Sequence, residues 1–77
     1  MEEIKKHFSE KFNKGINLYF GYTPKNSEIA TLISTEIHPI TSETARRWRH
    51  GLNVPELITI KKIGKLLKIK FDDLFDE

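Results

Sequence analysis

Apolar residues recur at helical spacing at the start of the chain. Between residues 3 and 20 they lie mostly four positions apart, which places them on one side of a helix: Ile4, Phe8, Phe12, Ile16, Tyr19 and Phe20. Gly15 lies inside this segment and could divide it into two helices. The run Gly-Tyr-Thr-Pro at 21–24 interrupts the pattern, so we expect the first helical segment to end near residue 20.

A second helix is predicted from about Asn26 to Ile37. Apolar residues again share one side of it: Ile29, Ala30, Ile33 and Ile37. The pair His38-Pro39 ends this helix, because a proline pushes the preceding residue out of the helical region.

A third helix follows at once. Thr41 or Ser42 is suited to cap its N-terminus, and the helix should run to about His50. Gly51 is suited to the left-handed conformation that closes a helix.

The residues Asn-Val-Pro at 53–55 begin a fourth helix. Its predicted inner face consists of Leu57, Ile60, Ile63, Gly64 and Leu67. Its predicted outer face consists of Lys61, Lys62, Lys65 and Lys68. A short turn over 71–75 ends the pattern, so we predict a single all-α domain over residues 1–77, a compact bundle of about five helices.

Composition limits what can hold this fold together. The chain has 77 residues and no cysteine, so its core must be apolar packing without disulfides or thiolate metal sites. It has neither an apolar run of the ~20 residues that span a bilayer nor the apolar core of a signal peptide. We therefore expect a cytoplasmic protein that makes no membrane contact.

The net charge is only +2, but the charges are unevenly placed. Residues 46–70 contain eight Lys or Arg against one acid, Glu56, whereas the end of the chain carries Asp72, Asp73, Asp76 and Glu77. Two interpretations fit: a solvated helical surface with an acidic tail, or a side that faces a polyanion.

The third helix has two distinct sides at 100° per residue. Thr44, Ala45 and Trp48 form an inward arc, so Trp48 is expected in the core rather than stacked on a base. The outward arc carries Ser42, Glu43, Arg46, Arg47, Arg49 and His50. A helix of this kind fits a DNA major groove, where the arginine fork matches O6 and N7 of guanine.

Ala30 and Ala45 occupy the middle of the inward sides of the second and third helices. Two small residues there would let the helices cross closely, as a helix-turn-helix requires. Alanine is also simply a good helix former, and the sequence leaves both explanations open.

Three stretches in order resemble the lambda-repressor/Cro (XRE-type) helix-turn-helix family. They are "EIATLI", similar to the family's second helix, "ITSETARRWRHG", similar to its recognition helix, and "VPELITIKKIGKLLKIKFDDLF", similar to its closing helices. The resemblance covers about residues 26–75. Ala30 and Ala45 are fifteen positions apart rather than the family's usual ten, which implies a lengthened turn of about five residues.

The resemblance implies roles for nine residues. Base readout is expected from Ser42, Glu43, Arg46 and Arg47, where Glu43 could accept from cytosine N4 or only orient the two arginines. Phosphate contacts are expected from Asn26, Thr41, Arg49, His50 and Asn53. For Asn26 a helix-capping role is an equal alternative.

The expected function is that of a sequence-specific DNA-binding transcriptional regulator, a repressor, that binds a pseudo-palindromic operator as a homodimer. The dimer surface would be Phe71, Leu74 and Phe75, or the N-terminal helix. Alternatives are an antitoxin that binds DNA and a toxin, and a helical protein-interaction module without DNA binding. An RNA binder would show exposed aromatic residues for stacking, and the tryptophan is expected inside.

Catalysis and cofactor binding have no visible basis in this sequence. His7, His38 and His50 lack the spacing of metal ligands, and no phosphate-binding loop or nucleophile motif is present. We therefore expect neither an enzyme nor a bound metal or cofactor, and no small-molecule effector can be inferred.

Overall fold

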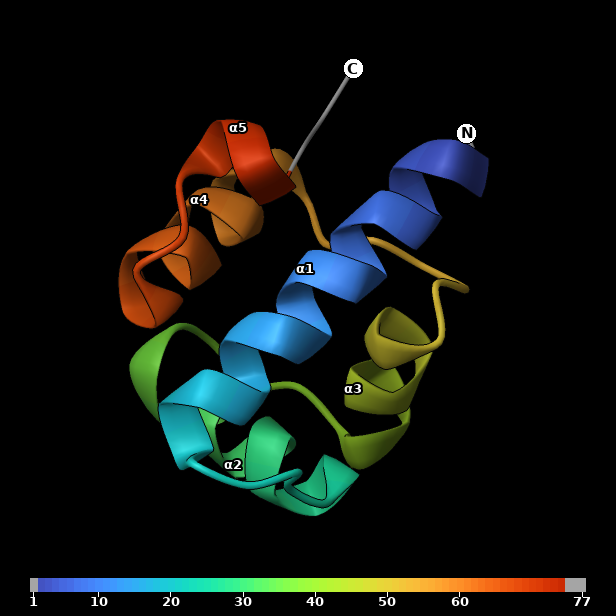
Figure 1. Ribbon diagram of the computed structural model, residues 1–77. Helices are drawn as coiled ribbons and strands as arrows, with labels where there is room; N and C mark the ends of the chain where they lie inside the picture. The colour runs from blue at the N-terminus through green and yellow to red at the C-terminus, as the bar shows by residue number, and fades with distance from the viewer. Residues whose placement is uncertain (1, 75–77) are drawn as a thin grey trace.

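Five helices make up the regular structure of residues 2–74, the part of the chain whose backbone is described (Figure 1). The computed structural model describes the backbone of residues 2–74 and the side chains of residues 4–74. The helices are α1 (Glu2–Phe20), α2 (Asn26–Glu36), α3 (Ser42–Arg49), α4 (Leu57–Leu67) and α5 (Phe71–Leu74). The prediction of an all-α bundle of about five helices is confirmed, although Phe75, at the end of the expected final turn, lies outside the described residues.

Helix α1 is the centre of the bundle. In Figure 1 it lies between α3 on one side and α4 with α5 on the other. Phe8, Phe12 and Ile16 on its inner face are fully buried. The Trp48 ring of α3 packs edge-on against both phenylalanines, with ring centroids 6.4 Å from Phe8 and 5.9 Å from Phe12. The aromatic contacts between these two helices therefore form the middle of the core.

Gly15 does not divide α1, which is one continuous helix. The glycine faces the side chains of Leu67 and Ile69. Close packing against these two side chains therefore accounts for a glycine at position 15, and a break in the helix does not.

Two predictions of burial and one of exposure are wrong. Leu57 is 53% exposed because α4 begins at this residue, and burial on that helix starts only at Thr59. Tyr19 is 50% exposed near the end of α1, while Leu74 is fully buried and so is not available as a dimer surface. In each case the helical spacing was right, but how far the neighbouring helices extend decides which residues are covered.

The connection between α2 and α3 is held by specific hydrogen bonds. The backbone N–H of Ile40 donates to Ser34 Oγ at 3.0 Å, and this hydroxyl lies 3.2 Å from the Ile40 carbonyl oxygen, to which it donates. A ring nitrogen of His38 lies 3.2 Å from Thr59 Oγ1 of α4, within hydrogen-bonding distance. Ala30 and Ala45 are both buried, and α2 and α3 pack together more extensively than any other pair of helices. The long connection is therefore compatible with close helix crossing.

Candidate nucleic-acid interface

Helix α3 begins and ends at the positions that its sequence predicts. Thr41 is the N-cap, and its Oγ1 accepts from the backbone N–H of Thr44 at 3.1 Å. At the other end Gly51 has a φ of 71°, and the N–H of Leu52 donates to the Arg47 carbonyl oxygen at 2.9 Å. This left-handed closure lets the chain leave the helix sharply and return toward α4.

The inward side of α3 is anchored in the core. Ala45 is fully buried and Trp48 is 5% exposed, as predicted. Thr44 is half-buried at the edge of this contact. Because the Trp48 ring packs against Phe8 and Phe12 of α1, the rotation of α3 about its own axis is defined, and so is the direction of its opposite side.

The opposite side presents an ordered group of charged side chains. Glu43 accepts from Arg46 through both carboxylate oxygens, at 2.9 Å from Nε and 2.6 Å from Nη2. Its Oε2 also accepts from Nε of Arg47 at 3.1 Å. The side chains of Arg46 and Arg47 remain 41% and 50% exposed. Of the two roles that the sequence leaves open for Glu43, orientation of the arginines is therefore the one it has in the free protein.

The same contacts change the acidity of Glu43. Hydrogen bonds from Arg46, and next from Arg47, lower the pKa of Glu43 to about 2. The hydrogen bond to the carboxylate in turn raises the pKa of Arg46 above its usual value. Glu43 and Arg46 are therefore charged throughout the physiological range, and the Glu43 carboxylate balances one of the positive charges on this side of α3.

Arg49 does not lie on the outward side, contrary to the sequence analysis. Its Nη1 donates to the Pro24 carbonyl oxygen at 3.0 Å and to Asn26 Oδ1 at 2.8 Å, and its Nε donates to Asn13 Oδ1 at 3.3 Å. At 100° per residue, Arg49 lies only about 40° from Ala45, four positions earlier. Because Ala45 is buried, this small angle could have predicted from the sequence that Arg49 turns inward.

Asn13 is a residue of this site that sequence reasoning missed. Its Nδ2 donates to the Arg49 carbonyl oxygen at 2.9 Å while its Oδ1 accepts from the Arg49 side chain. Arg49 and Asn13 therefore join α1, the start of α2 and the end of α3. No pattern in the sequence brings residues 36 positions apart together, so only the fold identifies this pair.

Asn26 is the first residue of α2 and not its cap. The N-cap is Lys25, whose backbone N–H donates to Glu28 Oε1 at 2.8 Å. Glu28 also accepts from the Tyr22 hydroxyl, and these two hydrogen bonds, Tyr22 first, lower the pKa of Glu28. The capping alternative for Asn26 is therefore not observed.

The other predicted contact residues lie around the exposed side of α3. Ser42 is exposed in its first turn, His50 is exposed at its end, and Asn53 is exposed in the connection to α4. The four predicted readout residues thus belong to one side of one helix, while Asn26 and Arg49 form a separate group where α2 begins and α3 ends.

Comparison of the chain with protein-family models, with curated proteins and with solved structures finds no match. Within the described residues, no three His, Asp or Glu side chains are grouped so that they could hold a metal ion. None of the described helices has the length and apolar character needed to cross a membrane. The assignment of this surface therefore rests on its own geometry and chemistry.

Proposed function

We propose that this protein is a sequence-specific DNA-binding transcriptional regulator that acts as a repressor in the cytoplasm. One observation carries the proposal: α3 is anchored by Ala45 and Trp48 while Arg46 and Arg47 are held facing outward by Glu43. The sequence resemblance to the lambda-repressor/Cro family supports the same assignment, because the stretch that resembles that family's recognition helix, residues 40–51, contains α3.

The dimensions of α3 suit a short recognition element. Its eight residues span about 12 Å at 1.5 Å per residue. A major groove admits one helix, and a helix of this length reaches only a few base pairs. We therefore propose that two copies bind a pseudo-palindromic operator, with half-sites about 34 Å apart. Domains that measure 29 × 22 × 22 Å fit side by side at that spacing.

Each predicted contact has a role in this arrangement. Arg46 and Arg47 donate to guanine O6 and N7, and Glu43 and Ser42 read the neighbouring base edges or orient the arginines. Thr41, His50 and Asn53 bind phosphates on either side of the groove. Asn26 and Arg49 act together at a further phosphate, because both belong to the group at the start of α2.

The dimer surface must lie elsewhere than on Leu74. Around the connection from α3 to α4, three large apolar side chains are more than half exposed: Leu52, Leu57 and Ile58. Pairing of two copies through this region would bring the ends of the two α3 helices toward each other, as adjacent half-sites require. We therefore propose this region as the dimer surface in place of Leu74, with the N-terminal helix α1 as the alternative.

A helical protein-interaction module is the second candidate. The observation that favours it is the use of Arg49 within the fold, which leaves Arg46 and Arg47 as the outward arginines of α3. Glu43 balances one of these two charges. The two candidates differ in whether duplex DNA binds at all.

Selection from a randomised duplex pool, followed by sequencing, tests DNA binding, base preference and half-site symmetry together. On the selected site, Arg46→Ala should weaken binding by about 1–3 kcal/mol, because a bidentate guanine contact is lost. Circular dichroism should show an unchanged fold, since Arg46 is partly exposed. A Lys14→Ala variant, altered on α1, is the matched control. Unchanged affinity of the Arg46 variant would remove this residue from the readout set.

Salt dependence separates the two candidates. Every phosphate contacted releases counterions, so log Kd should change with log salt by about 0.9 per phosphate. Fluorescence anisotropy with the selected duplex at several salt concentrations measures this slope. A flat response together with an unenriched pool would favour the protein-interaction module.

A further inference from the structure

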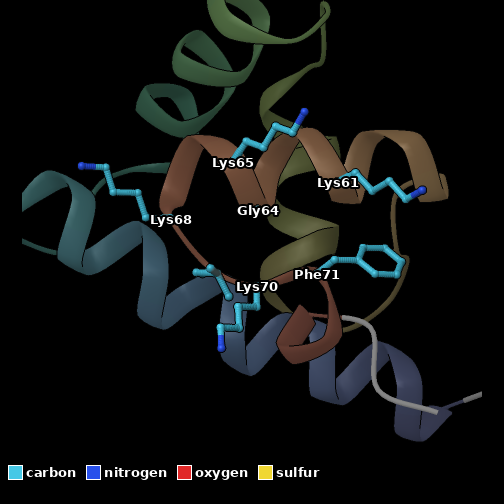
Figure 2. Close-up of a pocket in the computed structure, with 7 residues that line it drawn as sticks. Lys61, Gly64, Lys65, Lys68, Lys70 and Phe71 are labelled. Carbon is cyan, nitrogen blue, oxygen red and sulfur yellow. The ribbon is translucent and has the colours of Figure 1, made fainter.

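Two adjoining hollows lie on the side of α1 that faces away from α3. The first, of about 480 Å³, lies between α4 and the segment 68–71 (Figure 2). The second, of about 350 Å³, lies between that segment and α1. Both are lined by Lys68, Ile69 and Lys70. The two hollows therefore form one continuous surface, which we call the lysine groove.

Six lysines from three parts of the chain line the lysine groove: Lys11, Lys14, Lys61, Lys65, Lys68 and Lys70. Among the residues that the structure describes, the one acidic side chain that lines it is Asp73. Within the described residues the ion pairs are those of Glu43 on α3, so none of these lysines forms an ion pair with a carboxylate among residues 4–74. The sequence shows the row on α4, but only the fold adds Lys11, Lys14 and Lys70 to it.

Between the lysines the surface is apolar. Gly64, Ile69 and Phe71 line the first hollow, and Leu18 and Leu67 line the second. Leu18 is 76% exposed, the highest fraction among the large apolar residues of the segment 4–74. A ligand that covers both an exposed leucine and an adjoining apolar depression gains binding free energy, because water is released from the two apolar surfaces.

The directions of the lysines indicate the shape of the ligand. Figure 2 shows Lys61 and Lys65 leaving α4 on one side, Lys68 on another and Lys70 below the segment, so the ammonium groups surround the apolar centre without converging. A small phosphate needs donors that point to one place. A ligand with an apolar centre and negative charges along its edges matches this arrangement better.

The geometry points to a docking site for an acidic segment of a partner protein, in which carboxylates flank an aliphatic or aromatic side chain. The apolar side chain lies over Gly64 and Ile69, and the carboxylates pair with the surrounding lysines. In Figure 1, α1 lies between α3 and the pair α4 and α5, and the groove is lined by α4, residues 68–71 and α1. A DNA duplex held by α3 would therefore leave the groove open. The inference does not depend on the proposed DNA binding.

The test uses the full chain and a synthetic peptide in which glutamates flank one tryptophan. Titration followed by ¹H–¹⁵N NMR should shift the amide signals of α4, of residues 68–71 and of the middle of α1, and leave those of α3 unchanged. A matched peptide with glutamine for glutamate should bind more weakly because it lacks the negative charges. A peptide with serine for tryptophan should also bind more weakly because it lacks the apolar side chain.

A double variant, Lys65→Glu with Lys70→Glu, should weaken peptide binding about tenfold, since attraction is replaced by repulsion at two solvated positions. Lys6→Glu, an equal type of change on an exposed lysine outside the groove, should leave binding unchanged. Arg46→Ala should also leave it unchanged, which keeps this test separate from that of DNA binding. Circular dichroism checks the fold of each variant. If the charge-reversed protein does not fold, the double variant Lys65→Gln with Lys70→Gln, which removes the two charges without reversing them, takes its place.

Three results would overturn the inference: no shift with the peptide, equal binding by the charge-reversed and parent proteins, or shifts that map to another surface. The same titration with random-sequence duplex DNA and with phosphatidylglycerol vesicles completes the experiment. If either of these shifts the groove signals and the peptide does not, the groove binds phosphate-rich surfaces and the acidic partner is rejected.

Discussion

At the scale of single residues, the outward side of α3 depends on Glu43. Its carboxylate is held by Arg46 and Arg47, so its protonation releases both guanidinium groups. The folded state lowers the pKa of Glu43 from 4.5 to about 2. Because the folded pKa is the lower one, the stabilising contribution is present above pH 4.5 and is lost as the pH falls toward 2. Side-chain ¹³C NMR should therefore find a titration midpoint of Glu43 near 2.

Replacement of Arg46 by methionine should move that midpoint upward, toward the ordinary value of a glutamate, because the largest cause of the shift is removed. Lys14→Ala, on α1, should leave it in place. A midpoint that stays near 2 in the Arg46 variant would show that Arg46 is not what holds the carboxylate.

At the scale of an element, the end of α4 requires glycine at position 64. A β carbon there would lie 2.7 Å from the Ile69 carbonyl oxygen, a backbone atom that cannot move aside cheaply. The segment is fixed because Lys68 has a φ of 59° and the N–H of Ile69 donates to the Gly64 carbonyl oxygen at 2.8 Å. Gly64→Ala should thus destabilise the protein by about 1–3 kcal/mol, although alanine favours a helix by about 1 kcal/mol.

Gly15→Ala is the matched control for urea denaturation. Its added β carbon would meet the end of the Ile69 side chain, which can rotate away, so the helix-forming gain offsets much of the cost. Equal losses of stability in both variants would mean that the backbone contact at Gly64 is not the decisive one.

At the scale of the whole molecule, Arg49 joins three helices. Its side chain donates to Asn13 on α1 and to Pro24 and Asn26 at the start of α2, and so fixes how α3 lies against both. Lysine cannot reproduce the fork that makes these contacts. Arg49→Lys should therefore cost about 1–3 kcal/mol in the free energy of unfolding, measured by urea denaturation.

Arg47→Lys provides the comparison, because Arg47 is an exposed residue of the same helix. It should change stability by no more than about 0.5 kcal/mol. If both variants lowered the free energy of unfolding equally, the contacts of Arg49 between helices would not contribute to stability.

Local patterns were enough for most of the helices. Helical spacing of apolar residues, the Thr41 cap and the Gly51 closure predicted α3 almost to the residue, because caps and closures act within a few positions. The same spacing did not show that Leu57 and Tyr19 are about half exposed. A helical pattern shows which side of a helix is apolar, but not how far the neighbouring helix reaches along it.

The candidate site divides in the same way. The sequence placed Glu43, Arg46 and Arg47 on one side of α3, since their spacing of three and four positions sets their contacts within the helix. It did not reveal that Arg49 is shared with Asn13 and Asn26, because those contacts cross between helices.

By itself, the sequence determined the helical class, the ends of α3 and the inward position of Trp48, since these follow from interactions between near neighbours in the chain. The tertiary structure alone decided that Arg49 turns inward, that Leu74 is covered and that six lysines surround one groove. Those features arise where distant segments meet, and their positions depend on how all the helices pack at once.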